Sequence, residues 1–249
     1  MLERADNWLI SAHMIDEKTA KGWAKQSCDK IFDVVWNFLK YLYSGERLRI
    51  LLAVTALMWI LTIVNVVIGG KLTEFGIAPR DFPFGFLGIF FAPLIHSSIG
   101  HVAANTISFI FLGALVMLRG IKVWAIMSVL IAISSGFLVW VLAASGSHHV
   151  GASSMIFGYF GYLVIVACIE RHWKSVLIAL VVGFLYGGMI FGIFPGANDK
   201  VSWEGHFSGM LMGGLCGYFH MIVFGGMVIE RPDLPYEYNP VNTKDSESA

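Results

Sequence analysis

The chain contains six stretches of about 20 residues that are dominated by apolar side chains and hold no Asp, Glu, Lys or Arg. A helix that crosses the hydrocarbon core of a bilayer needs about 20 such residues, because each residue adds about 1.5 Å of rise. The six stretches are residues 50–69, 99–118, 123–144, 153–169, 176–194 and 205–228. The pattern predicts an all-α, polytopic membrane protein with six transmembrane helices.

The polar ends divide the chain into three parts. Residues 1–49 are predicted to form a polar N-terminal segment, residues 50–228 the six-helix membrane domain, and residues 229–249 a disordered tail. Between the first two helices, prolines and glycines interrupt an apolar stretch that begins at Phe82. Non-helical backbone at membrane depth is tolerated only against protein or a water-filled cavity. We therefore expect a partly embedded first loop beside such a cavity.

Composition supports a lipid bilayer as the main partner. Hydrophobic residues make up 57% of the chain and charged residues only 14%, whereas soluble domains carry about 25% charged residues. The formal net charge is zero, so no basic surface indicates nucleic-acid binding. The three cysteines show no spacing typical of disulfides or metal ligands, and no metal or other cofactor is expected.

The positions of lysine and arginine predict the orientation. If the N-terminus is inside, the cytoplasmic side holds 14 of the 17 Lys and Arg residues and the outer side holds Lys71, Arg80 and Lys200. Positive charge is enriched on the cytoplasmic side of membrane proteins. Both termini are therefore expected in the cytoplasm, and the second, fourth and sixth helices begin on the outer side.

Unexpected polar residues gather at that outer end. They are His101 and Asn105 in the second helix, Ser153 in the fourth and His206 in the sixth, with His96 just before the second helix. Ionisable and strongly polar groups inside a membrane are expensive and usually functional. His101 and Asn105 are four residues apart, so they share one helix face. Four residues from three helices at one depth predict a single site.

The residue types predict acyl-transfer chemistry. A serine hydroxyl becomes a nucleophile when an adjacent base accepts its proton, and His206 can be that base for Ser153. His101, Asn105 and the backbone at Ser153 can donate hydrogen bonds to a tetrahedral oxyanion. No acidic residue lies within the six stretches, so we expect a Ser–His dyad.

Glycines are expected to bring the two helices together. Gly151 permits a sharp entry into the fourth helix. Gly209 and Gly213 fall on the same face of the sixth helix as His206, and small residues let membrane helices approach closely.

Three segments resemble the rhomboid family of intramembrane serine proteases. They are HSSIGHVAANTISFIFLG from His96, GASSMIFGYFGY from Gly151 and GHFSGMLMGG from Gly205, and the resemblance extends over about residues 46–228. It implies that Ser153 is the nucleophile, His206 the general base, His101 and Asn105 oxyanion donors, and His96 a lining residue. Phe157 stands where some members carry a tyrosine that packs against the histidine.

The resemblance also implies a biological setting. The family cleaves transmembrane segments of other proteins without a metal or cofactor, and the fifth helix is its usual candidate for lateral substrate entry. A chain of this size with no appended folded domain implies a bacterial inner (plasma) membrane.

Two alternatives remain open. A rhomboid pseudoprotease would bind membrane helices without cutting them, and Ser154, where the family usually has glycine, favours it. A small transporter would predict internal repeats, which the sequence lacks. His148 and His149 are interpreted as exposed loop residues.

Overall fold

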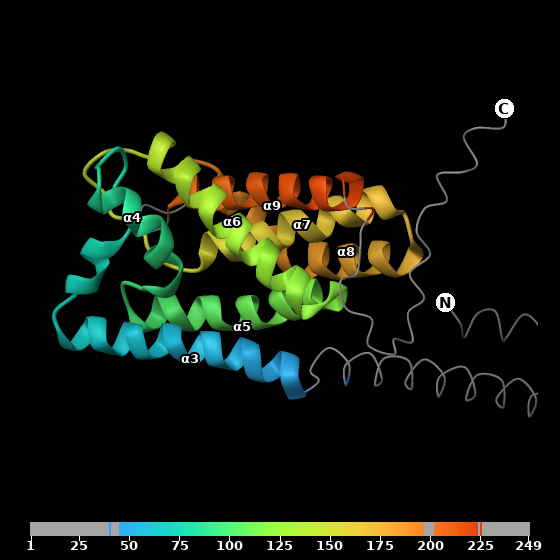
Figure 1. The fold of residues 1–249 in the computed structure, drawn as a ribbon, viewed down its shortest axis with the longest axis horizontal. Helices are drawn as coiled ribbons and strands as arrows, with labels where there is room; N and C mark the ends of the chain where they lie inside the picture. Colours follow the sequence, from blue (N-terminus) through green and yellow to red (C-terminus); the bar gives the residue numbers. More distant parts are fainter. Residues whose placement is uncertain (1–39, 41–44, 197–201, 224, 226–249) are drawn as a thin grey trace, which may run out of the picture. The chain divides into compact units, whose positions relative to one another are not determined.

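The computed structural model describes residues 40, 45–196, 202–223 and 225 (Figure 1). Most of the predicted N-terminal segment and all of the predicted tail lie outside these residues. The chain divides into two units at Gly45, and the description below concerns the unit that begins at Glu46. In the described residues every regular element is a helix, apart from one isolated β-bridge between Ile77 and His149. The all-α prediction is confirmed.

Five described helical spans have the length and hydropathy to cross a membrane. They are α3 (Gly45–Val67), α5 (Ile99–Val116) continued by the 3-10 turn η3 (Met117–Arg119), α6 (Ile121–Leu142), α7 (Ser153–Glu170), and α8 (Trp173–Tyr186) continued by the 3-10 helix η4 (Gly187–Ile193). The sixth predicted helix is α9 (Trp203–Val223), whose 21 residues include five glycines and two histidines. These lower its hydropathy below that of the other five, although it is long enough to span.

Two predicted elements differ in detail. The fifth predicted helix changes from α-helix to 3-10 helix at Gly187 and Gly188, because successive glycines destabilise an α-helix. The first loop is more regular than expected: it contains η1 (Lys71–Phe75), α4 (Phe84–Phe91) and η2 (Ala92–Leu94). Its depth in a bilayer stays a prediction.

Helix α7 occupies the centre of the bundle (Figure 1). It packs against α5, α6, α8 and α9, and it is the most buried of the five spans. Its contact with α9 is made through backbone. A Cβ atom added at Gly213 would lie 2.5 Å from the Cα of Gly158 on α7, whereas carbon atoms in contact are about 3.5–4.0 Å apart. Glycine at this crossing therefore sets the separation of the two helices.

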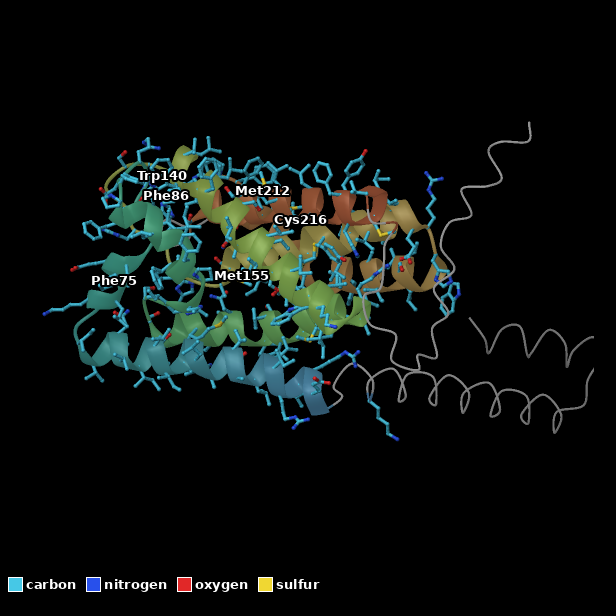
Figure 2. The ribbon with its side chains drawn as sticks, in the orientation of Figure 1. Phe75, Phe86, Trp140, Met155, Met212 and Cys216 are labelled. Carbon is cyan, nitrogen blue, oxygen red and sulfur yellow. The ribbon has the colours of Figure 1, made fainter. Side chains whose placement is uncertain are left out.

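The first loop is anchored on the end of α6. Phe86 of α4 meets Trp140 edge-to-face at 5.5 Å between ring centroids, and Figure 2 labels the pair. Beneath them is a small buried cluster: Ile77, Ile89, Ala92, Val139 and Ala143. This packing holds the loop next to the segment that leads into α7.

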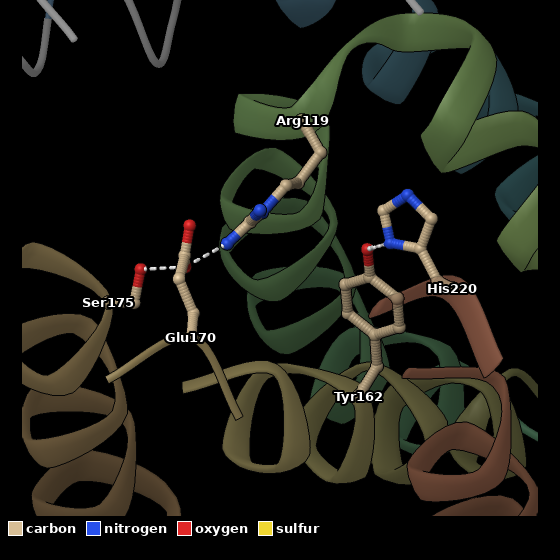
Figure 3. Close-up of polar contacts among 5 residues, drawn as sticks. All are labelled: Arg119, Tyr162, Glu170, Ser175 and His220. Carbon is tan, nitrogen blue, oxygen red and sulfur yellow. Dashed lines mark hydrogen bonds and ion pairs between the residues drawn. The ribbon is translucent and has the colours of Figure 1, made fainter. Parts of the chain in front are cut away.

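A polar cluster ties the helices together at the opposite end of α7 (Figure 3). Arg119 of η3 forms an ion pair with Glu170, which also accepts a hydrogen bond from Ser175 of α8. Nearby, Tyr162 and His220 are hydrogen-bonded at 2.7 Å, joining α7 to α9. Within α7, Glu170 lies 17 residues beyond Ser153, about 25 Å of helix rise, and Tyr162 lies nine residues beyond it.

Candidate active site

The N-terminus of α7 has a backbone conformation that requires glycine. Gly151 has φ +115°, which side-chain-bearing residues rarely adopt, and its N–H donates to the Ala92 carbonyl at 2.8 Å. The next N–H, of Ala152, donates to Nε2 of His96 at 3.2 Å. Two successive backbone bonds to the first loop thus fix the segment that presents Ser153.

His96 connects this segment to α3. The side chain of His96 is fully buried, and its backbone carbonyl accepts a hydrogen bond from Asn65 Nδ2 at 3.0 Å. Because Nε2 accepts a hydrogen bond, the imidazole is neutral and its proton is on Nδ1. Burial, reinforced by neighbouring His101, lowers the pKa of His96 to about 4. Asn65 was not predicted as a site residue, although an amide near the end of an apolar stretch is a signal in the sequence.

His101 lies directly against Gly151. A Cβ atom added at Gly151 would be 2.7 Å from His101 Cε1 and 2.8 Å from its Nε2. The His96 and His101 rings meet edge-to-face at 5.0 Å, and Ser97 Oγ is 3.2 Å from His101 Nδ1. If that hydroxyl donates to Nδ1, the proton of His101 is on Nε2, the nitrogen beside Gly151.

Asn105 provides a second donor at the same place. Its Nδ2 is 3.7 Å from the position of a Cβ at Gly151. This nitrogen is buried and has no hydrogen-bond partner among the residues that the structure describes. Buried polar groups are normally paired, and each exception needs an explanation. An unpaired amide donor beside the start of α7 is suited to an acceptor that arrives with a ligand.

His206 is positioned by an aromatic ring and a carbonyl group. Its ring stacks on Phe157, with centroids 4.0 Å apart and 14° between the planes. Phe157 follows Ser153 by four residues, so both lie on one face of α7. His206 Nδ1 is 3.1 Å from the carbonyl oxygen of Gly192 in η4. A carbonyl only accepts, so Nδ1 carries the proton and Nε2 keeps its lone pair.

Ser153 and the N-terminus of α9 line the same small cavity. Its volume is about 30 Å³, and Gly151, Ser154, Ser202 and Gly205 also line it. A buried water needs about 10–15 Å³ on this measure, so the cavity has room for about two. Among the described contacts, no hydrogen bond links Ser153 to His206. Catalytic hydrogen bonds are often long before substrate binds.

The structure thus places near the start of α7 the residues singled out from the sequence: Ser153, His206, His96, His101, Asn105, Gly151 and Phe157. Gly209 and Gly213 lie farther along α9, where they set its distance from α7. Among the described residues, no group of three or more His, Cys, Asp and Glu gathers that could hold a metal ion. The expectation that no metal takes part stays a prediction.

The interpretation of His149 as an exposed loop residue is wrong. His148 is exposed, whereas His149 is half-buried and hydrogen-bonded through both ring nitrogens. The sequence could not indicate this, because the partners of His149 come partly from Ser202, more than 50 residues away. Gly192 was also missed, since a backbone carbonyl leaves no signal in the sequence.

Comparisons with known proteins identify the family of the chain. A family model described as Rhomboid domain matches residues 83–222, which include all the site residues above except Asn65. Proteins of Mycobacterium bovis and Mycobacterium tuberculosis, both named only as uncharacterised, are 36% identical over 177 residues, which cover 68% of this chain and 72% of theirs. An uncharacterised protein of Mycobacterium leprae is 34% identical over 139 residues, covering 53% of this chain and 55% of its own. The chain therefore belongs to the rhomboid family of membrane proteins.

Proposed function

We propose that this protein is an intramembrane serine endopeptidase that uses Ser153 as nucleophile and His206 as general base. The observation that carries the proposal is the state of His206. Its ring is stacked on Phe157, and Nδ1 donates to the Gly192 carbonyl, so Nε2 is the basic nitrogen. A carbonyl group here takes the orienting role that an acidic residue has in a catalytic triad.

The reaction follows from these roles. Ser153 Oγ attacks the carbonyl carbon of the scissile peptide bond while its proton passes to Nε2 of His206. The resulting imidazolium gives that proton to the leaving amine as the C–N bond breaks, which leaves an acyl ester on Ser153. Water then attacks the ester carbonyl carbon while one of its protons passes to Nε2. The imidazolium returns that proton to Ser153 Oγ as the ester C–O bond breaks, which releases the new carboxyl end and restores the hydroxyl.

Three donors are available for the negative oxygen of the tetrahedral intermediate. Asn105 Nδ2 is buried and unpaired among the described residues, and His101 Nε2 lies beside Gly151. The N–H of Ser153 is in the first turn of α7, where a helix has no internal acceptors. Removing one such donor lowers kcat by about 10²–10³ in serine proteases.

The substrates we propose are transmembrane segments of other membrane proteins. The span formed by α8 and η4 favours lateral entry of a substrate. Only 6% of its apolar stretch is buried inside the bundle, and a Cβ atom added at Gly183, Gly187 or Gly188 would meet nothing within 4 Å. We place both termini in the cytoplasm on the asymmetry of Lys and Arg. We place the protein in a bacterial inner membrane on its resemblance to bacterial members of the family. The site then opens toward the outer face.

The test is cleavage of a single-span substrate by the purified full-length protein in detergent or liposomes, beside Ser153→Ala and the matched control Ser154→Ala. We expect cleavage and fluorophosphonate labelling to vanish only in Ser153→Ala. Loss only in Ser154→Ala would move the nucleophile by one residue. If the unmodified protein binds a panel of such segments without cutting them and takes up no probe, the protein is a pseudoprotease.

A further inference from the structure

His149 links the two segments that carry the proposed dyad. Its backbone pairs with Ile77 through two hydrogen bonds of 2.9 Å, which anchor it to the first loop. Its ring reaches in the other direction, with Nδ1 2.8 Å from Ser202 Oγ and Nε2 2.9 Å from Ser147 Oγ. His149 precedes Ser153 by four residues, and Ser202 precedes His206 by four.

Ser202 caps the helix that carries His206. The Gly205 N–H donates to Ser202 Oγ at 3.0 Å, and the His206 N–H donates to the Ser202 carbonyl at 3.3 Å. A serine side chain that accepts from an early backbone N–H is a typical N-cap and fixes where the helix begins. The first turn of α9, and His206 within it, are thus placed by Ser202.

The hydroxyl of Ser202 has a complete set of partners. It donates to Glu204 Oε2 at 3.3 Å and accepts from the Gly205 N–H. Its remaining lone pair is satisfied if His149 Nδ1 carries a proton and donates to it. Burial lowers the pKa of His149, against the opposing effect of Glu204. His149 thereby fixes the orientation of the cap.

We propose that His149 is a positioning residue, which holds the cap of α9 and so sets the placement of His206 relative to Ser153. This inference rests on the proposed function. The other contacts between α7 and α9 that the site uses, the Phe157 stack and the glycine crossing, orient the ring and set the helix separation. The hydrogen bond between His149 and Ser202 adds a restraint at the start of α9, on the side that lines the cavity.

Two amide substitutions distinguish the hydrogen bond made by Nδ1 of His149 from the one made by Nε2. In His149→Asn the amide lies near the position of Nδ1 and can keep the bond to Ser202. In His149→Gln the amide reaches the position of Nε2 and keeps only the bond to Ser147. Neither changes the backbone pairing with Ile77. Because a misplacement of about 1 Å can lower a rate by 10²-fold, we expect kcat to fall about 10- to 100-fold in His149→Gln, with KM unchanged, and much less in His149→Asn.

Substitutions of Ser202 complete a double-mutant cycle with His149→Gln. Ser202→Ala should lower kcat by a similar factor, Ser202→Thr should keep most of it, and His149→Gln should add little on the Ser202→Ala background. Residues that act through one contact are non-additive in this way. Equal losses in His149→Asn and His149→Gln, additive effects of His149→Gln and Ser202→Ala, or an unchanged kcat in His149→Gln would each overturn the proposal.

Hydrogen exchange provides a readout that needs no catalysis. Amides of residues 203–209 should exchange faster in His149→Gln than in the unmodified protein or in His149→Asn, while those of α5 should not change. If exchange responds in this way but no variant or parent cleaves a substrate, the link stands and the protease assignment fails. If the parent cleaves and exchange in His149→Gln is unaltered, the link is wrong and the protease assignment stands.

Discussion

The close approach of α9 to α7 makes Gly209 a sensitive position for the proposed reaction. Gly209 follows His206 by three residues and faces the backbone of Ser154. A Cβ atom there would lie 2.8 Å from the carbonyl carbon of Ser154 and 2.9 Å from its Cα. These are backbone atoms of a buried helix, so no side-chain rotation can relieve the overlap in Gly209→Ala.

The size of the displacement follows from contact distances. Carbon atoms in contact are about 3.5–4.0 Å apart, and the Ser154 carbonyl oxygen lies closer to the added Cβ than either carbon, so α9 must move away from Ser154 by about 1 Å or more. A misplacement of about 1 Å can lower a rate by 10²-fold, and we expect a loss of kcat of this order. Overpacking of a tight contact also destabilises by about 1–3 kcal/mol.

The measurement is kcat for a single-span substrate, together with thermal unfolding in the same detergent. Gly214→Ala is the matched control, because it lies on the same helix and its Cβ would meet only the side-chain atom Ile165 Cγ1, at 3.3 Å. We expect the control to keep more than about half of the activity. Full activity in Gly209→Ala, or equal losses in the two variants, would refute the reasoning that backbone separation positions His206.

Two further predictions concern the two ends of α7. Gly151→Ala should lower the rate of fluorophosphonate labelling of Ser153 by at least about 10²-fold, because alanine is strained at this φ and its Cβ displaces the His101 ring. The control Gly100→Ala has open space around its Cβ and should label normally. Equal labelling rates in the two variants would argue against a role for His101. Arg119→Met should reduce the free energy of unfolding in detergent by about 3–5 kcal/mol, because it removes the cation of a buried ion pair, and adding Glu170→Gln should recover at least half of that loss. An unfolding midpoint that does not move in Arg119→Met would show that the pair contributes little to stability.

Several features of the site could be predicted from one sequence because each depends on a local pattern. Apolar runs without charge define the helices, and the position of His101, Asn105, Ser153 and His206 near one end of the bundle follows from where each run begins. The glycine at 151 indicated a special turn, and the structure places it at φ +115°. Which residues perform catalysis remains a prediction that the cleavage assay has to test.

Other features could not be predicted, because they are contacts between segments distant in the chain. Asn65 binds the backbone of His96 from α3, and the Gly192 carbonyl selects the tautomer of His206 from η4. His149 was misinterpreted for the same reason, since a histidine in a polar loop looks exposed until its distant partner Ser202 is known.

The sequence by itself determined the all-helical membrane architecture and the set of polar residues at one end of it. Hydrophobic length and the expense of placing polar groups in lipid act on each segment independently, so they can be evaluated residue by residue. Only the tertiary structure decided how those residues are oriented, because a hydrogen bond between a ring nitrogen and a carbonyl depends on positions that packing sets to within tenths of an ångström.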